Sequence, residues 1–208
     1  MIERAFAEFA AARGRTIALA APLTQAQLDF RARPGRWSIG ENLDHLLRAE
    51  NLYRSEFARL IDLARAGERP YIRRTFSEVN VAPLYIPDLF LPLLDVPFTI
   101  MNRFVPQSVR DYATEYPLLP TRNPTIATPC AGRSGPELRD ELVSSLERTR
   151  TLLVTNADLP FEQMISEHPL MGVANVAQIL AFMARHEKRH QSQIEKVRAD
   201  GRFPPPNP

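Results

Sequence analysis

The chain has 208 residues, which is enough for one domain of about 150–200 residues with its own hydrophobic core. Apolar residues make up 44% and charged residues 24%, a composition typical of globular proteins rather than of disordered chains. The formal net charge is +2, from 26 basic and 24 acidic residues, and so even a balance argues against nucleic acid or an anionic membrane surface as the partner.

Cysteine content and the first residues favour a reducing compartment. The single cysteine, Cys130, excludes an intramolecular disulfide and a cysteine-rich zinc site. The N-terminus carries acidic side chains where a secretory signal has a basic region followed by an apolar run. No run of about 18 apolar residues occurs without charge or proline, so no transmembrane helix is predicted. We therefore expect a cytoplasmic protein with no membrane partner.

Proline divides the chain into two helical parts and a middle segment. Eleven of the 19 prolines fall between Pro70 and Pro136, and four follow Phe203. Because proline lacks a backbone N–H and breaks helices, long helices are expected only on either side of this middle segment. We predict one domain over residues 1–208, with a proline-rich insertion at about 68–134 and a disordered tail at about 202–208.

Two helices are predicted before the insertion. Apolar residues recur near a spacing of 3.6 over residues 2–20, which indicates the first helix. A turn at 33–36 then leads to Ser38 and Glu41, the spacing of a capping box, in which each side chain satisfies a free amide at the helix start. The second helix is expected to continue to about Ala66, with Gly67 as its stop.

Two more helices are predicted after the insertion. Ser134-Gly-Pro-Glu137 has the composition of a helix start, and leucines then follow at steps of three and four to about Asn156. The last helix begins near Asn175, a common N-cap residue with Gln178 three positions later, and runs to Asp200. Four helices of this length predict an all-α four-helix bundle.

The connection between the second and third helices is unusual in length and composition. It spans about 65 residues, far more than an ordinary loop, and would let these two helices run parallel. Its part at 84–105 is strongly apolar and carries a proline every four or five residues. One interpretation is a loop that covers an open end of the bundle. The other is a pocket wall or a contact in a homodimer, because large exposed apolar patches usually have a partner.

Two of the four histidines point to a metal site. His186 and His190 lie one turn apart on the last helix, so both imidazoles can reach one cation. They interrupt an apolar stripe that continues on either side of them, which predicts that they are buried. Burying an unpartnered imidazole costs roughly 1–3 kcal/mol, and a shared metal ion removes this cost. The alternative is a pair of hydrogen-bonded histidines in the core.

The same segment, His186-Glu-Lys-Arg-His190, also matches the metalloprotease pattern in which the glutamate is the general base. A protease needs a third ligand, usually downstream, and no histidine follows His190. No strand that could bind an extended peptide is evident either. We therefore interpret Glu187 as a flanking or solvated charge and reject the protease.

A third ligand has to come from upstream, and spacing alone leaves two candidates. His45 lies on the second helix, but about 120° from the centre of its apolar stripe. His168 precedes Pro169 in the segment before the last helix, where histidines are usually solvated or capping. Periodicity does not choose between them.

Three short motifs resemble those of one protein superfamily. They are Trp37-Ser-Ile-Gly-Glu-Asn-Leu-Asp-His45-Leu, His168-Pro-Leu-Met-Gly172 and His186-Glu-Lys-Arg-His190-Gln-Ser-Gln-Ile194. Together they resemble the DinB/YfiT-like superfamily over most of the chain apart from the proline-rich middle. The resemblance implies an up-down-down-up bundle and a metal held by three histidines, here His45, His186 and His190. Zinc or nickel suits imidazole ligands best, with iron and manganese as alternatives.

Other polar and aromatic residues near these motifs are interpreted as structural. Trp37 is expected to pack where the second helix begins. Cys130 is expected to be inert or solvent-facing rather than a fourth ligand. Gln193, Arg185 and Arg189 flank the histidines and could line the site or hold an anionic substrate, but a surface position is the default interpretation.

Three functions are compatible with this site. The superfamily resemblance implies thiol-dependent S-transferases and isomerases, so the first hypothesis is a metal-dependent transferase that activates a low-molecular-weight thiol. The second is a metal-dependent hydrolase, because a bound metal lowers the pKa of water toward 7. The third is a non-catalytic, stress-associated metal-binding protein whose apolar segment forms a dimer.

Overall fold

The computed structural model describes residues 1–75, 104, 109, 127–168 and 172–206. The apolar segment at 84–105 lies outside the described residues apart from Phe104. Its predicted role as a cover for the bundle or as a subunit contact therefore stays a prediction.

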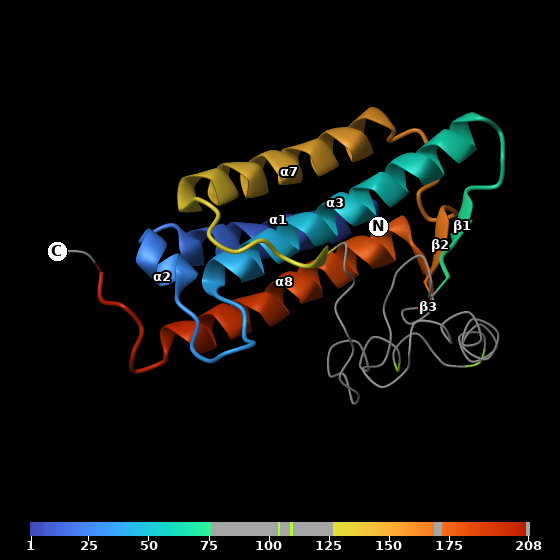
Figure 1. Cartoon of the computed structure of the whole chain (residues 1–208). Helices are drawn as coiled ribbons and strands as arrows, with labels where there is room; N and C mark the ends of the chain where they lie inside the picture. Colours follow the sequence, from blue (N-terminus) through green and yellow to red (C-terminus); the bar gives the residue numbers. More distant parts are fainter. Residues whose placement is uncertain (76–103, 105–108, 110–126, 169–171, 207–208) are drawn as a thin grey trace.

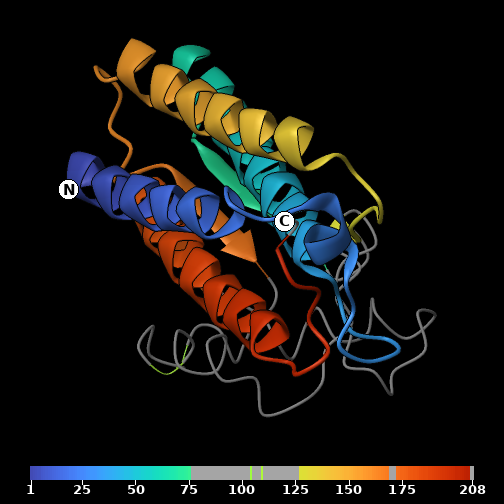
Figure 2. The same ribbon diagram turned by 90° about the vertical axis from the view of Figure 1, so that its left-hand side faces the viewer.

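Four long helices pack together, as the sequence predicts (Figure 1). They are α1 (Ile2–Ala20), α3 (Ile39–Arg65), α7 (Gly135–Thr155) and α8 (Val176–Arg198). In Figure 1, α3 and α7 run in one direction while α1 and α8 run in the other. Figure 2 shows α1 between α7 and α8, and α1 contacts both of them. None of the helices in the described ranges is long and apolar enough to cross a membrane.

The predicted helix starts are confirmed at all three positions, and two of them carry a side-chain capping pair. At Ser38 the side chain accepts from the Glu41 amide at 3.2 Å, and the Glu41 carboxylate accepts from the Ser38 amide at 2.8 Å. Asn175 and Gln178 form the same reciprocal pair at the start of α8. Ser134 precedes α7, but its side chain makes no capping hydrogen bond, and a proline in the first turn favours the helix start instead.

The prediction of an all-α chain is wrong in one respect, because a small three-stranded sheet lies at one end of the bundle (Figure 1). Strand β1 (Tyr71–Arg73) pairs in parallel with β2 (Ile165–His168), which pairs antiparallel with β3 (Gly172–Asn175). A short helix, α2 (Gln25–Asp29), was also not predicted. Three- and four-residue strands are too short to show a period in the sequence, and their pairing is decided by distant partners.

The sheet is attached directly to the helices that carry the histidines. Strand β3 ends at Asn175, which is also the N-cap of α8, so the sheet fixes where α8 begins. Ser166 of β2 donates to Glu56 of α3, and Tyr71 of β1 donates to Glu167 of β2. The sheet therefore ties the start of α8 to the second half of α3.

The interior consists of two apolar clusters with a buried polar layer between them. The cluster nearer the sheet contains Phe9, Phe57, Leu60 and Met164 among others, and the cluster at the opposite end is built from the side chains of Leu28, Ile39, Leu43, Leu138, Leu142 and Ile194. Along each of the four long helices, buried polar residues lie between the segments that form these clusters. They are Arg13, Thr16, Glu50, Ser145, Thr149, Glu187, His190 and Gln191. His190 thus belongs to a polar layer that crosses the whole bundle.

Part of the expected tail contacts the helices. Phe203 packs edge-on against Phe30, with ring centroids 5.6 Å apart. The side-chain amide of Gln27 in α2 donates to the carbonyl of Pro204 at 2.8 Å. The residues just after α8 therefore lie along α2 and its C-terminal end.

Candidate metal centre

The structure brings His45 and His186 together with His190 of the polar layer. His45 projects from the second turn of α3, and the other two project from α8. Ligand atoms from the three residues all lie within 4.8 Å of one another. The Nε2 atom of His186 is 3.3 Å from Nε2 of His45 and 3.1 Å from Nε2 of His190. His45 and His190 are buried, and His186 is half-buried.

Hydrogen bonds on the far side of two rings define which nitrogen carries the proton. His45 Nδ1 is 2.7 Å from the carbonyl oxygen of Ala127, and His190 Nδ1 is 2.7 Å from Oδ1 of Asn42. Both partners are oxygens that can only accept, so each Nδ1 carries the hydrogen and donates it. The Nε2 atoms of His45 and His190 are left with lone pairs directed at His186.

Two of the distances between the histidine nitrogens suit a tetrahedral metal ion. Two nitrogens that each lie about 2.0–2.1 Å from zinc are about 3.3 Å apart at the tetrahedral angle. The two Nε2–Nε2 distances are 3.3 and 3.1 Å. His186 has one Nε2 and can donate to only one of its two neighbours, so the Nε2 lone pair of His45 or of His190 is left without a donor among the three histidines. A cation at this point would bind that lone pair.

Burial keeps the three imidazoles in their neutral form. Loss of hydration lowers the pKa of His186 and of His190 well below 6.5, and the charges of neighbouring histidines and Arg189 lower both further. Burial also lowers the pKa of His45, although the Ala127 carbonyl opposes this shift. A neutral imidazole is the form that binds a metal, so the cluster is ready to bind at neutral pH.

Aromatic rings flank the three histidines. The Trp37 ring lies 4.7 Å from the His45 ring and stacks on His190, with centroids 6.1 Å apart. Phe182 stacks on His186 at 5.8 Å. Trp37 does lie where α3 begins, as predicted, but it also forms a wall of the site. The apolar rings lower the local dielectric and hold the imidazole planes in place.

The carbonyl that orients His45 belongs to a segment held by Asp44, the residue before it in α3. One oxygen of this fully buried carboxylate accepts from the Cys130 amide and from Arg48, each at 2.7 Å, and the other accepts from Arg133 at 2.7 Å. Burial favours the protonated carboxyl, but these hydrogen bonds outweigh burial and lower the pKa of Asp44. The carboxylate therefore fixes residues 127–133 beside the site.

Cys130 itself is exposed and lies outside the histidine group. Its sulfur is 3.1 Å from Nη2 of Arg48, which keeps the side chain on the surface of the segment. This placement agrees with the expectation of a solvent-facing cysteine.

Glu187 is not solvated, and the sequence-based interpretation of it was wrong. Its side chain is 1% exposed and accepts from Arg13 at 2.7 Å and from Thr16. Both oxygens are therefore used in contacts with α1, so Glu187 is not available as a protease general base. On α8, Glu187 is directed toward α1, whereas His186 and His190 are directed toward α3. The ion pair and the histidine cluster therefore lie on different faces of the helix.

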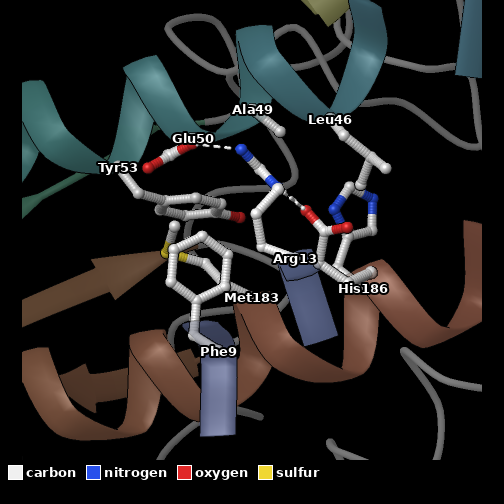
Figure 3. Close-up of a pocket in the computed structure, with 9 residues that line it drawn as sticks. Phe9, Arg13, Leu46, Ala49, Glu50, Tyr53, Met183 and His186 are labelled. Carbon is white, nitrogen blue, oxygen red and sulfur yellow. Dashed lines mark hydrogen bonds and ion pairs between the residues drawn. The ribbon is translucent and has the colours of Figure 1, made fainter. Parts of the chain in front are cut away.

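Arg13 joins three helices at the centre of the polar layer. Its guanidinium contacts Glu187 of α8 and, at 2.7 Å, Glu50 of α3, and all three side chains are 1% exposed (Figure 3). Thr149 of α7 donates to the other oxygen of Glu50 at 2.7 Å. The three charged side chains line a small cavity of about 10 Å³, which also reaches His186 and Tyr53. The charged network is thus next to the histidines.

The residues that flank the histidines are less exposed than expected. Arg189 is half-buried, burial lowers its pKa, and its charge lowers the pKa of all three histidines, so it lies near the cluster. Gln193 is half-buried and forms a hydrogen bond that raises the pKa of His190. Arg185 is also half-buried.

Sequence reasoning missed Arg13, Glu50 and Asn42. A signal for the first two was present, because Arg13 follows Phe9 by one helical turn and Glu50 follows Leu46 by one turn, so both occupy buried stripe positions. Two opposite charges on core-facing positions predict a buried ion pair. No comparable signal identifies Asn42, because its role depends on where α8 lies.

His168 is placed in strand β2, outside the histidine group. Burial, reinforced by the charge of Arg74, lowers its pKa to about 4. An unfolded histidine has a pKa near 6.5, so protonation favours the unfolded chain. The contribution of His168 to stability is therefore complete above pH 6.5 and is lost as the pH falls toward 4.

We expect this loss to reach at most about 3 kcal/mol, which corresponds to a shift of about 2.5 pKa units. Urea unfolding at several pH values would measure it in the wild type and in His168→Asn, which cannot titrate. The variant should show the weaker dependence between pH 6.5 and 4. If the free energy of unfolding fell with pH equally in both proteins, His168 would not have a lowered pKa. The other histidines are the same in both proteins and do not affect the comparison.

Comparison with known protein families matches residues 8–194 to the DinB superfamily. The match covers most of the chain, including His45, His186 and His190, all of α3 and α7 and most of α1 and α8. No curated protein and no solved structure matches the chain.

Proposed function

This chain belongs to the DinB superfamily, and we propose that His45, His186 and His190 bind one divalent metal ion at the centre of a catalytic site. The observation that carries this proposal is the convergence of the three Nε2 atoms, with two rings fixed by hydrogen bonds so that their lone pairs face the same point. Zinc or nickel suits three imidazoles, with iron and manganese as alternatives.

The charge of the ligand set favours an anionic fourth ligand. Within the described part of the chain, the group contains three neutral imidazoles and neither a carboxylate nor a thiol. A divalent metal bound there would keep its full charge and supply a Lewis acid that favours a thiolate or a hydroxide over the protonated form. The site thus has the open character of catalytic rather than structural metal centres.

The reaction we propose is the transfer of a low-molecular-weight thiol to an electrophile. A free thiol with a pKa of about 8.5 is only a few per cent ionised at neutral pH, so a site that favours the thiolate increases the amount of nucleophile. The thiol loses its proton to solvent, and a carbon–sulfur bond forms as the leaving group departs with its bonding electrons. Since Cys130 is held on Arg48 away from the histidines, the thiol would be an external co-substrate.

The residues around the histidines would hold and shield the reacting groups. Trp37 and Phe182 present apolar faces beside the imidazoles and would exclude water from the electrophile. Arg189 places a positive charge near the same point and would attract an anionic part of the substrate. These contacts support a small-molecule substrate, and the homodimer remains a separate prediction.

The activity test compares the wild type, His190→Ala and His168→Ala, all supplied with the same metal. A generic electrophile is offered with several biological thiols, and conjugate formation is measured. We expect turnover by the wild type and by His168→Ala, and none above background by His190→Ala. Metal-dependent hydrolysis of a simple ester without any thiol requirement would replace the transferase with the hydrolase. Inactivity in both assays would favour the non-catalytic metal-binding protein.

Metal binding should also stabilise the fold, because the site links α3 to α8 and does not persist in an unfolded chain. At a free metal concentration of 100 times the Kd, the free energy of unfolding should rise by about 2.7 kcal/mol. Thermal denaturation with and without zinc would show this as a higher Tm in the wild type, and as no change in His190→Ala. An equal shift in both proteins would indicate binding elsewhere.

A further inference from the structure

The side-chain oxygen of Asn42 is held in hydrogen-bond contact with His190. Asn42 lies in the first turns of α3 and is 1% exposed. Its amide nitrogen donates to the carbonyl of Ser38 at 2.8 Å, and its Oδ1 is 2.7 Å from His190 Nδ1. Because the Ser38 carbonyl can only accept, turning the amide around would lose this hydrogen bond and bring two oxygen atoms into contact. The oxygen of Asn42 must therefore face the imidazole.

The helix start that carries Asn42 is itself rigidly held. Ser38 and Glu41 form the reciprocal capping pair, and Arg31 contacts both oxygens of Glu41, at 2.9 and 2.6 Å. The acceptor is thus attached to the end of α3 through Ser38, not to a mobile surface side chain. Its position relative to His190 is set by how α3 and α8 pack.

The tautomer of His190 decides whether this residue can offer an Nε2 lone pair to a cation. With the hydrogen on Nδ1, the Nε2 lone pair faces the other two histidines. With the hydrogen on Nε2, the ring would donate to Nε2 of His186, only 3.1 Å away, and the two histidines would pair with each other. An isolated neutral imidazole side chain favours the hydrogen on Nε2, so an external acceptor at Nδ1 is needed to reverse this preference.

We propose that Asn42 is a positioning residue, which holds His190 in the Nδ1–H tautomer and so keeps the Nε2 lone pair of His190 directed at the other two histidines. The assignment of the tautomer depends only on the hydrogen bonds of Asn42, whereas its effect on metal affinity rests on the proposed function. Loss of a partner of this kind typically lowers metal affinity 10–100-fold. Asn42 contacts the Nδ1 side of the His190 imidazole and not the Nε2 side that faces the other histidines.

The direct test is the tautomer of His190 in the metal-free, full-length protein. Long-range ¹H–¹⁵N correlation spectra with labelled histidine distinguish a protonated Nδ1 from a protonated Nε2. We expect Nδ1–H in the wild type, a shift to Nε2–H in Asn42→Leu, and retention of Nδ1–H in Asn42→Asp, which keeps an acceptor oxygen. A wild-type spectrum with Nε2–H at His190 would overturn the proposal, even if no variant folded.

Gln191→Leu is the matched control. Gln191 is a buried amide on the same helix and donates to the carbonyl of Ala12 at 2.8 Å and to Thr16 at 3.0 Å, but it holds no histidine. Its loss should lower stability while leaving the His190 tautomer and the zinc Kd unchanged. Asn42→Leu should weaken zinc binding 10–100-fold in competition with a chelator. If zinc binding were weakened equally in both variants, Asn42 would only stabilise the fold and would not position His190.

The two readouts also separate this proposal from the proposed function. If the wild type binds no zinc, nickel, iron or manganese, the metal site is wrong. The tautomer spectra of the same samples would still decide whether Asn42 controls His190.

Discussion

Replacing His190 with alanine is expected to lower the affinity for zinc by more than about 100-fold, since loss of an outer hydrogen-bond partner alone costs 10–100-fold. The variant removes one of three converging Nε2 atoms and leaves two, which is too few for a stable site. His45→Ala should show a loss of similar size. Titration of metal-free protein against a chromophoric chelator would give the Kd values.

His168→Ala is the control for this experiment, because His168 lies in the sheet and outside the histidine group. Elemental analysis of protein purified without a chelator should show about one equivalent of metal in the wild type and in this variant. Full occupancy in His45→Ala together with loss in His168→Ala would show that the ligand set is wrong.

Replacing Arg13 with leucine is expected to destabilise the protein by about 3–5 kcal/mol, the usual cost of removing one partner from a buried charge network. The substitution leaves Glu50 and Glu187 buried at 1% exposure without the cation that lies between them. A loss of this size is a large fraction of the stability of an ordinary domain. Urea denaturation followed by far-UV circular dichroism would measure it.

Arg4→Ala on the same helix is the matched control. Arg4 pairs with Glu8 at 3.1 Å, but its side chain is 88% exposed, so its loss should change the stability by less than about 1 kcal/mol. Adding Glu50→Gln and Glu187→Gln to Arg13→Leu removes both uncompensated charges and should recover part of the lost stability. If Arg13→Leu and Arg4→Ala lowered the free energy of unfolding by the same small amount, the buried charge network would not be a major source of stability.

The polar layer also explains why the metal need not be essential for folding. Arg13 and the carboxylates around it satisfy one another, and two apolar clusters enclose them. The bundle therefore has a core that does not depend on the histidines. We expect the metal-free protein to stay folded at a lower Tm, unlike small zinc domains that unfold without metal.

The four long helices and most of their ends were determined by the sequence alone. Helical periodicity and capping depend on residues within a few positions of one another, so Ser38 with Glu41 and Asn175 with Gln178 could be recognised without knowing the fold. The same local logic paired His186 with His190, because one helical turn places both on one face. It also predicted correctly that His190 is buried.

Only the tertiary structure decided the rest. The strands β1 and β2 pair across almost a hundred residues, and such contacts leave no periodic trace in a three-residue segment. His45 was predicted as the third ligand from the resemblance to a family, because its position on the helix wheel did not identify it. The opposite charges of Arg13, Glu50 and Glu187, and the acceptor on Asn42, acquire their roles only where helices meet. A buried polar group needs a partner, and that partner comes from whichever helix packing brings within hydrogen-bond distance.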